Sequence, residues 1–570
     1  MDRGKIARNC MRRRRLDFPA RTSLLCVAVA AAASAQEIAA VTLVADGRTT
    51  GCIVLPAGVD EVEGRVWTAA KDLAGYIKQM SGAHVPTRWD NERCVGFRLL
   101  IGSTTLAPVK LSDVSEKNVG FDGFIIRSVP NGVVIAGRTP QGTANGVYYF
   151  AEQVLGVRWF AMDQDGPTCP KRSTIQIPPL GLTVKPDFAQ RQLAPYSIRR
   201  FMPKEELARW GRWMRFHRAG GIRAECGHIY DSIVPDRLFK THPEYFPLID
   251  GKRTLTGDHD SRCLSNPDVL RMAIDHTRRK FESGPGILFA SLSPMDSTMV
   301  RWCQCENCMD MGPTPSHQAL AFANAVAEAN EDLYPDKGYI MLAYLATIEP
   351  PVGMKAHRSV VPMVAPMMQC RIHPIDSDCP SRVHVREIYR GWLDIAGRIT
   401  KYDYFPLAGP FNGIVITMAE DLRFVRDSGG DLGGYRDYSG GPQAGFAMGI
   451  WMDVKLVWDV DQDPVKLRRQ FIEGYYGRAA SDPMERVYVH MENYIRTSPF
   501  GERPKGESNY GHRFWPLRYL APAVEGCRED IEAAKKAVRS EPEIFRKRVE
   551  RDMATLLGEH VAWWDRLDPP

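Results

Sequence analysis

The sequence predicts an α/β protein: a TIM-type (β/α)8 barrel, preceded by a small α+β domain and followed by a helical domain. Three observations lead to this fold class. Strand and helix patterns alternate through residues 186–460, as in parallel βα units. Residues 36–180 mix short strands with two helices, and residues 461–570 are helical in periodicity. A chain of 570 residues is long enough to bury more than one core.

The first 35 residues differ from the rest of the chain in charge. They hold eight basic and two acidic side chains, which accounts for the whole formal charge of +6. A short apolar run at 24–33, too short to span a bilayer, leads to Ala33-Ser34-Ala35 before Gln36. This pattern predicts a secretory signal peptide over 1–35; an uncleaved anchor or a misassigned start codon is the alternative.

We therefore expect export to the periplasm or the extracellular space, with no integral membrane span after cleavage. The neutral remainder gives no basic face, which argues against a nucleic-acid partner.

Residues 36–180 predict one α+β domain. Apolar residues recur at helical spacing from Val66 to Ile77, and Pro140 opens a second helix that runs through Leu155. The pair Asn131-Gly132 provides the positive φ values of a tight hairpin turn. Strands are expected at 41–44, 51–55, 97–101, 123–129 and 133–136, and residues 157–160 close the domain.

The barrel and the C-terminal domain follow from longer periodic segments. Barrel strands are expected at 286–292, 339–345, 360–364 and 399–404, and barrel helices at 205–218, 267–282, 318–333, 386–398 and 418–427. C-terminal helices are expected at 464–475, 482–496, 525–540 and 541–567. No glycine-rich phosphate pattern follows a barrel strand, which argues against nucleotide binding.

Two carboxylates are predicted at the carboxyl ends of barrel strands, where the loops of such a barrel converge on its axis. Asp296 follows the strand at 286–292, and Glu349 follows the strand at 339–345. A pair of carboxyl groups can protonate a leaving oxygen and meet the positive charge of an oxocarbenium-like transition state. We assign Glu349 as acid/base and Asp296 as nucleophile or charge stabiliser. Either carboxylate could instead cap a loop or a helix.

Histidines and aromatic residues near the strand ends are candidate substrate-binding groups. Imidazole can bind a hydroxyl group, and an aromatic face can stack on a sugar ring. Each could equally be a structural hydrogen-bonding or core residue. The candidates are His228, Trp302, Tyr344, His373, Tyr404 and Tyr435.

The thirteen cysteines include a cluster of three, Cys303, Cys305 and Cys308. Three thiols in six residues can bind a structural zinc ion with a fourth ligand such as Cys263, Cys226 or a histidine. In an exported protein they can equally form one disulfide within the cluster and a second to a distant cysteine. Redox or iron–sulfur chemistry is a third interpretation. We expect no cofactor to be required for the chemistry.

The N-terminal domain resembles the accessory domain that precedes the barrel in bacterial α-glucuronidases and β-hexosaminidases. The resemblance rests on the helix at 66–80, on Leu100-Ile-Gly-Ser103, and on Gly137-Arg-Thr-Pro-Gln-Gly142 followed by Gly146-Val-Tyr-Tyr-Phe150. It implies a scaffold that accompanies glycosidase barrels.

The barrel resembles a bacterial family catalogued as domain of unknown function 4838, part of which belongs with glycoside hydrolase family 163. The matching motifs are Ser293-Pro-Met-Asp296, Trp302-Cys-Gln-Cys-Glu-Asn-Cys308, His242-Pro-Glu-Tyr-Phe246, Cys263-Leu-Ser-Asn-Pro267, Tyr344 with Pro350-Pro351, Tyr402-Asp-Tyr404, Trp458-Asp459 and Phe471 with Gly474-Tyr-Tyr-Gly477. Characterised members of family 163 are endo-β-N-acetylglucosaminidases acting on N-glycans, so the resemblance implies a sugar substrate.

Two departures argue against substrate-assisted catalysis. Ser297 follows Asp296, so the adjacent Asp-Glu pair of hexosaminidases is missing, and Gly433-Gly-Tyr-Arg436 supplies no acid at its strand end.

These observations predict an exported glycoside hydrolase whose partner is an oligo- or polysaccharide with N-acetylglucosaminyl or uronyl groups. A glycan-binding protein without turnover, on the same barrel, is the alternative. A zinc hydrolase is disfavoured because the His-Glu-x-x-His pattern is missing.

Overall fold

The computed structural model describes residues 40–58, 64–194, 202–255, 261–284, 286–296, 301–367, 369–370, 373–404, 415–430, 433–437, 447–497 and 517–556. The predicted signal peptide at 1–35 lies outside these ranges. Residues Ala40–Pro570 group into one compact unit. Within the described ranges, no helix combines the length and the apolar character needed to cross a bilayer.

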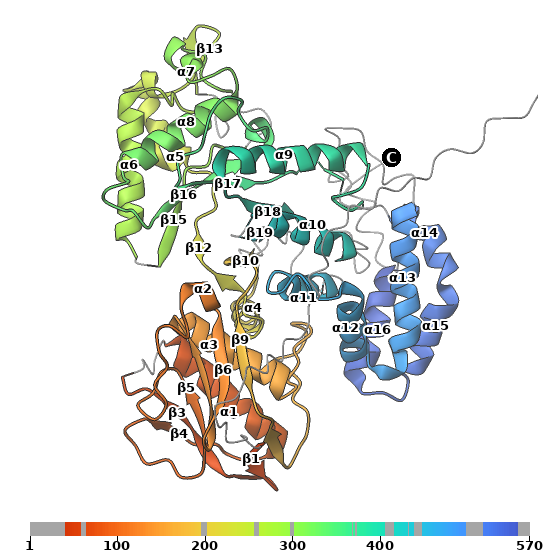
Figure 1. Ribbon diagram of the computed structural model, residues 1–570. Coiled ribbons are helices and arrows are strands. Elements are labelled where there is room, and N and C mark those ends of the chain that lie inside the picture. The colour runs from red at the N-terminus through yellow and green to blue at the C-terminus, as the bar shows by residue number, and fades with distance from the viewer. Residues whose placement is uncertain are drawn as a thin grey trace, which may run out of the picture. The chain divides into compact units, whose positions relative to one another are not determined.

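A six-stranded sheet is the centre of the N-terminal part (Figure 1). Its order is β4-β3-β5-β7-β6-β9, in which β4, β3, β5 and β7 run parallel and β6 is antiparallel to both of its neighbours. A separate three-stranded sheet has the order β2-β1-β8. The strands are β1 (Val41–Ala45), β2 (Arg48–Thr49), β3 (Gly51–Leu55), β4 (Thr87–Trp89), β5 (Phe97–Ile101), β6 (Phe124–Val129), β7 (Gly132–Gly137), β8 (Ile175–Ile177) and β9 (Gly181–Val184).

The helices of this part begin and end where local chemistry requires it. The helix α1 (Arg65–Ser81) stops at Gly82, whose φ of 79° is left-handed and whose N–H donates to the Lys78 carbonyl. The helix α3 (Pro140–Tyr149) starts with the Thr139 side chain accepting the Gly142 N–H. It continues as a π-helical turn, η1 (Phe150–Val154), and α2 (Glu116–Val119) is a single turn.

The hairpin expected at Asn131-Gly132 is confirmed, with β6 and β7 paired around it and a φ of 57° at Asn131. Residues 157–160, expected to close this domain, form no strand. Arg158 forms only an isolated bridge to Thr168, and the segment is apolar because Trp159 and Phe160 are buried in the core.

The second large sheet has eight strands and is nearly closed into a barrel. Its order is β11-β10-β19-β18-β17-β16-β15-β12. The two strands at the ends of this order, β11 and β12, are separated in the chain by Ile222 alone, so one segment borders both edges. The strands are β10 (Gln190–Ala194), β11 (Gly220–Gly221), β12 (Arg223–Ala224), β15 (Ile287–Ser291), β16 (Gly338–Ala343), β17 (Val360–Val364), β18 (Thr400–Tyr404) and β19 (Gly433–Asp437).

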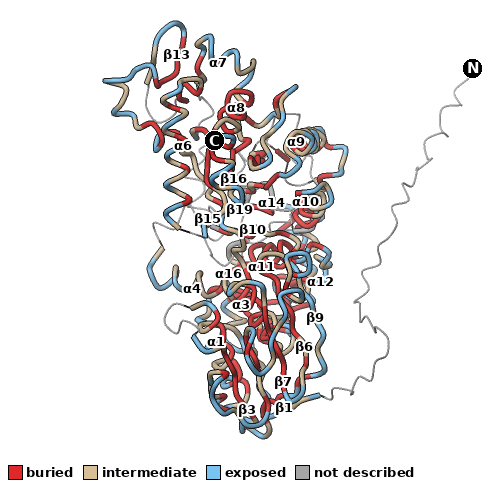
Figure 2. Tube along the Cα trace, turned by 60° about the vertical axis from the view of Figure 1, so that its left-hand side comes forward, coloured by how far each residue is buried: buried red, intermediate tan, exposed pale blue. Residues whose placement is uncertain are grey.

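The architecture is therefore mixed α/β with a barrel-like sheet, and it differs from the predicted eightfold barrel. Seven of the eight described strands run parallel, whereas β11 is antiparallel to β10. Alternate side chains of neighbouring strands fill the interior, among them Ala224, Ile340, Leu342, Val361 and Met363. Figure 2 shows that β16 of this sheet is buried over most of its length, as is β7 of the N-terminal sheet.

Helices pack on this sheet, α6 against β15, α8 against β16 and β17, and α9 against β17. The helices of this part are α4 (Lys204–Phe216), α5 (Tyr230–Ile233), α6 (Pro267–Glu282), α7 (Glu306–Asp310), α8 (Pro315–Glu328), α9 (Pro380–Ala396), α10 (Val415–Asp427) and α11 (Ala447–Leu456). The connection from β16 to β17 contains only a 3-10 turn, η5 (Leu345–Thr347). Pro350 and Pro351 follow it after two residues, and proline cannot donate the hydrogen bonds of a helix interior.

The C-terminal part is helical. Its elements are α12 (Pro464–Tyr476), η7 (Arg478–Ala480), α13 (Ser481–Thr497), α14 (Leu517–Gly526), α15 (Arg528–Ala537) and α16 (Glu543–Leu556). The ring of Phe160, from the N-terminal part, packs against Trp451 of α11 and Phe471 of α12 at centroid distances of 5.4 and 5.8 Å.

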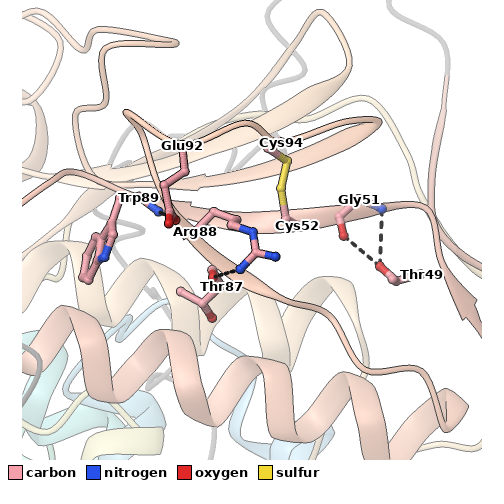
Figure 3. The surroundings of a disulfide bond; sticks show 8 residues. All are labelled: Thr49, Gly51, Cys52, Thr87, Arg88, Trp89, Glu92 and Cys94. Carbon is pink, nitrogen blue, oxygen red and sulfur yellow. Dashed lines mark hydrogen bonds between the residues drawn. A yellow bond between two sulfur atoms is a disulfide. The ribbon is translucent and has the colours of Figure 1, made fainter.

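One disulfide is present in the described part of the chain. It joins Cys52 of β3 to Cys94 in the loop that follows β4 (Figure 3).

Candidate active site

The carboxyl ends of β12, β15 and β16 lie next to one another and carry four of the predicted site residues. β12 is paired with β15 and β15 with β16, and an isolated parallel bridge between His228 and Ser293 extends the pairing beyond the strands. Asp296, Trp302 and Tyr344 follow β15 and β16 in the chain. Loops at this end of a parallel barrel surround its axis, so these side chains converge.

His228 is fixed by the backbone of the neighbouring loop. Its Nδ1 hydrogen-bonds the Pro294 carbonyl oxygen, so Nδ1 carries the proton and donates. Its Nε2 lies 3.7 Å from Oδ1 of Asp296. The imidazole ring is 6.1 Å from the ring of Tyr344. The carboxyl of Asp296 remains 65% exposed, and it is therefore accessible to a ligand.

Tyr344 is held by a tight turn at the end of β16. The buried hydroxyl of Thr347 accepts the Tyr344 backbone N–H at 3.2 Å. The same hydroxyl lies 3.0 Å from the carbonyl oxygens of both Leu342 and Tyr344 and donates to one of them. Leu345, between these residues, has a φ of 47°, which is unfavourable for a residue with a Cβ. The surrounding structure therefore imposes this turn.

A small pocket that is open to solvent lies beside these groups. The indole Nε1 of Trp302 is buried and has no hydrogen-bond partner within the described residues. A buried donor without a partner is costly. The lining residues are His228, Pro294, Met295, Trp302, Leu342, Tyr344, Ala346 and Thr347.

Glu349, the second predicted carboxylate, contacts a different element. Its Oε1 lies 2.9 Å from Nε2 of His384 on α9, and its side chain is 61% exposed. The preceding residue, Ile348, accepts a hydrogen bond from the Trp392 indole, also on α9. These contacts hold Glu349 against a helix on the outside of the sheet, and it is not among the residues that line the pocket.

His373 lies beside two cysteines. Its Nδ1 is 3.4 Å from Sγ of Cys370, and the ligand atoms of Cys370, His373 and Cys379 all lie within 4.8 Å of one another. The contacts of His373 therefore favour a structural role over the predicted sugar contact.

Tyr404 and Tyr435 lie on β18 and β19, but their side chains are outside the described part of the structure. The backbone register pairs Tyr404 with Asp437, and Asp437 with Ala194 of β10. The prediction that this strand end supplies no acid is therefore wrong, because β19 extends one residue beyond Arg436 and ends at Asp437. The aspartate is the next residue in the sequence, and only the strand register reveals that the strand reaches it.

A further acid of β18 is neutralised by an ion pair. Asp403 lies 2.8 Å from Nζ of Lys401, and both side chains are at most 10% exposed. Lys401 also lies 3.6 Å from Asp421 of α10. Asp403 therefore belongs to a buried ion network between β18 and the helices.

The cysteine cluster has four members in the structure. Cys263 joins Cys303, Cys305 and Cys308, with all four sulfur atoms within 4.8 Å of one another. Cys263 was one of the fourth ligands that the sequence offered, and Cys226 is not part of the group.

A family model described as a domain of unknown function (DUF4838) matches residues 161–489. This range is more than half of the chain, so the chain belongs to that family. The predicted membership is confirmed, whereas the relation to glycoside hydrolase family 163 stays a prediction. No curated protein matches the sequence.

Solved structures with a similar fold include a family GH115 4-O-methyl-α-glucuronidase with specificity for decorated arabinogalactans. It is 13% identical, with a TM-score of 0.57 over 91% of this chain and 72% of that chain. A β-hexosaminidase of Streptomyces plicatus is 14% identical, with a TM-score of 0.42 over 82% of this chain and 95% of that chain. At such identities the likeness to the glucuronidase shows a shared fold that extends over nearly the whole chain.

Proposed function

We propose that this chain is an exported glycoside hydrolase that binds a sugar in the pocket beside His228, Asp296, Trp302 and Tyr344. The observation that carries the proposal is the accessible Asp296 carboxylate next to an aromatic pocket, at which the Trp302 indole N–H has no hydrogen-bond partner among the described residues. The ring faces can stack on a sugar, and the indole can donate to one of its hydroxyl groups. The fold shared with the α-glucuronidase supports the same class of substrate.

In this proposal Asp296 is the nucleophile or charge stabiliser at the anomeric carbon. His228 is a positioning residue, because its Nε2 faces the carboxylate while Nδ1 is tied to Pro294. The second carboxyl is Glu349, as the sequence predicts, provided that it exchanges its contact with His384 for substrate. Asp437, at the end of β19, is the competing candidate. Substrates with N-acetylglucosaminyl or uronyl groups follow from the family resemblance.

The test is hydrolysis by the purified full chain of N-glycans, chitooligosaccharides, glucuronoxylans and arabinogalactans, with products separated by chromatography. We expect Asp296→Asn to lower kcat by at least about 100-fold, because the change removes the charge that meets the oxocarbenium-like transition state. Glu349→Gln and Asp437→Asn identify the partner, because only the true second carboxyl gives a loss of similar size. Asp332→Asn, on an exposed turn after α8, is the control and retains activity. Full activity of Asp296→Asn refutes the assignment.

Export is the second part of the proposal. The signal-peptide pattern supports it, and so does the Cys52–Cys94 disulfide, because disulfides persist in oxidising compartments. N-terminal sequencing of secreted protein should find a start near Gln36.

The alternative function, glycan binding without turnover, is favoured by one observation. Asp296 is the carboxylate that the described contacts place beside the pocket, whereas Glu349 is held by α9. Binding on a glycan array with no product from any bound glycan would establish this alternative.

A further inference from the structure

The four cysteines 263, 303, 305 and 308 form a compact cluster that the proposed reaction does not use. We propose that they bind one structural zinc ion. Cys263 comes from the loop before α6, and the other three come from the segment that leads from the barrel loop into α7. Three of the four side chains are buried, with exposed fractions of 3% or less.

The sulfur spacing fits a metal better than it fits disulfides. Sγ of Cys263 lies 3.7 Å from that of Cys305 and 3.9 Å from that of Cys308. Four sulfurs at about 2.3 Å from a tetrahedral zinc ion lie about 3.8 Å from one another, whereas a disulfide needs about 2.05 Å. The same chain forms a disulfide between Cys52 and Cys94, so the separation at this cluster is a property of the site.

The polar surroundings of the sulfurs suit thiolates. The Leu248 N–H donates to Sγ of Cys303 at 3.3 Å, and the Arg253 guanidinium donates to the same sulfur at 3.7 Å. The Ser265 hydroxyl lies 3.1 Å from Sγ of Cys308. Donors of this kind orient metal-bound thiolates and offset their charge. A closed set of four sulfur ligands is typical of structural zinc sites.

The cysteines also form a local apolar cluster of their own, separate from the main core. Around it lie a hairpin of two-residue strands, β13 (Leu248–Ile249) and β14 (Lys252–Arg253), and the single-turn α7, which are neighbours in both views (Figures 1 and 2). The local apolar cluster consists of the cysteines with Leu248 and Met311. Two-stranded hairpins are marginal in water, and small units of this kind need a staple such as a metal. A zinc ion would join the hairpin, α7 and the start of α6.

The site has a consequence for the pocket, and this step rests on the proposed function. Trp302 immediately precedes Cys303, and the Cys303 carbonyl accepts a hydrogen bond from Gln318 of α8. A metal at Cys303 would therefore fix the indole that lines the pocket. The metal site itself does not depend on the pocket's function, because metal content is measured without a substrate.

The experiment measures zinc in the full chain purified without chelators, by elemental analysis, together with a thiol count in denaturant. We expect one zinc per chain and four thiols that become reactive when the metal is extracted. Cys305→Ser and Cys308→Ser should each lower the zinc content per chain at least tenfold. Two matched controls, Cys527→Ser in the helical part and Cys379→Ser in the second cysteine group, should keep one zinc.

Cobalt substitution of the unmodified protein provides a readout if a variant fails to fold. Cobalt(II) bound by four thiolates should give an intense sulfur-to-metal absorption band. A metal-free protein whose four thiols react only after a reductant is added would show two disulfides and overturn the proposal. Iron in place of zinc, or zinc that is lost in Cys379→Ser but kept in Cys308→Ser, would overturn it as well.

Discussion

Single side chains determine the geometry of the turn after β16, which places Tyr344 at the pocket. The hydroxyl of Thr347 accepts the Tyr344 N–H and donates to a carbonyl oxygen of Leu342 or Tyr344, all in a buried position. Leu345 keeps a positive φ within the same turn. A residue held in an unfavourable conformation costs about 1–3 kcal/mol, so other contacts must offset it. The Thr347 hydrogen bonds are the contacts that do so.

Replacing Thr347 by valine should therefore destabilise the protein by about 1–3 kcal/mol, because a buried N–H and a buried carbonyl lose their partner. The change keeps the volume of the side chain and removes only the hydroxyl. Chemical denaturation measures the loss, and hydrogen exchange of the Tyr344 amide should become faster. Thr347→Ser keeps the hydroxyl and should leave that exchange rate unchanged. An unchanged exchange rate of the Tyr344 amide in the valine variant would contradict its hydrogen bond to the Thr347 hydroxyl.

The sequence could identify residues around the pocket, but it could not locate the second carboxylate. Asp296 and Tyr344 follow strands with strong apolar patterns, and their convergence follows from barrel geometry alone. His228 follows the two-residue strand β12, which has no such pattern. Glu349 follows an equally clear strand, yet its loop turns toward α9, because its partner His384 comes from a segment that the sequence cannot bring near. Asp437 was missed because the end of β19 is defined by its pairing with β10 and β18 rather than by composition.

At the scale of elements, helices and strands with regular patterns are predictable, and irregular connections are not. The helix expected at 267–282 matches the observed α6, and the strand expected at 360–364 matches the observed β17. The 157–160 segment has the composition of a strand because its rings fill the core. The connection from β16 to β17 has no α-helix, since prolines interrupt it.

Two glycines inside helices illustrate how packing changes the effect of the same substitution. An added Cβ at Gly474 of α12 would lie 2.0 Å from the Phe160 ring, which Trp451 and Phe471 hold in place. An added Cβ at Gly75 of α1 would have no neighbour within 4 Å. Gly474→Ala should therefore destabilise the protein by about 1–3 kcal/mol through overpacking. Gly75→Ala should stabilise it by about 0.5–1 kcal/mol through helix propensity.

Differential scanning calorimetry of both variants tests this expectation. The two changes should shift Tm in opposite directions. A stabilising Gly474→Ala would mean that Phe160 can move aside, and the aromatic contact between the N-terminal part and α12 would then be loose.

At the scale of the whole molecule, buried ion pairs connect segments that are far apart in the sequence. Glu152 of η1 pairs with Lys455 of α11 and, at 2.7 Å, with Arg218 after α4, with each of these side chains at most 6% exposed. Arg191 of β10 pairs with Asp122, and its guanidinium lies 4.8 Å from the centre of the Trp458 ring. The sequence predicts the separate parts, but it contains no periodic signal for such pairs, because the partners are up to 303 positions apart.

The Glu152 network makes stability depend on pH in a defined direction. Burial alone would raise the pKa of Glu152, but the Lys455 and Arg218 cations outweigh it and lower that pKa. The pKa of His217, which contacts Lys455, is lowered well below its usual value by burial and by that cation. In both cases the unfolded chain binds more protons than the folded one as the pH falls. Stability is therefore lost below about pH 6.5 for His217 and below about pH 4.5 for Glu152.

Glu152→Gln should cost about 3–5 kcal/mol at pH 7, because it leaves two buried cations without their partner. The difference between this variant and the unmodified chain should shrink as the pH falls from about 5 to 3, because Glu152 of the unfolded chain takes up a proton in this range while the folded chain, with its lowered Glu152 pKa, keeps the carboxylate charged. Denaturation midpoints across this pH range measure the difference. Glu543→Gln, which removes an exposed carboxylate paired with Lys547, is the matched control and should change stability by less than about 1 kcal/mol at every pH. A difference that does not change with pH would show that the pKa of Glu152 is the same in the folded and unfolded chains, and it would refute the proposed electrostatic coupling between these distant segments.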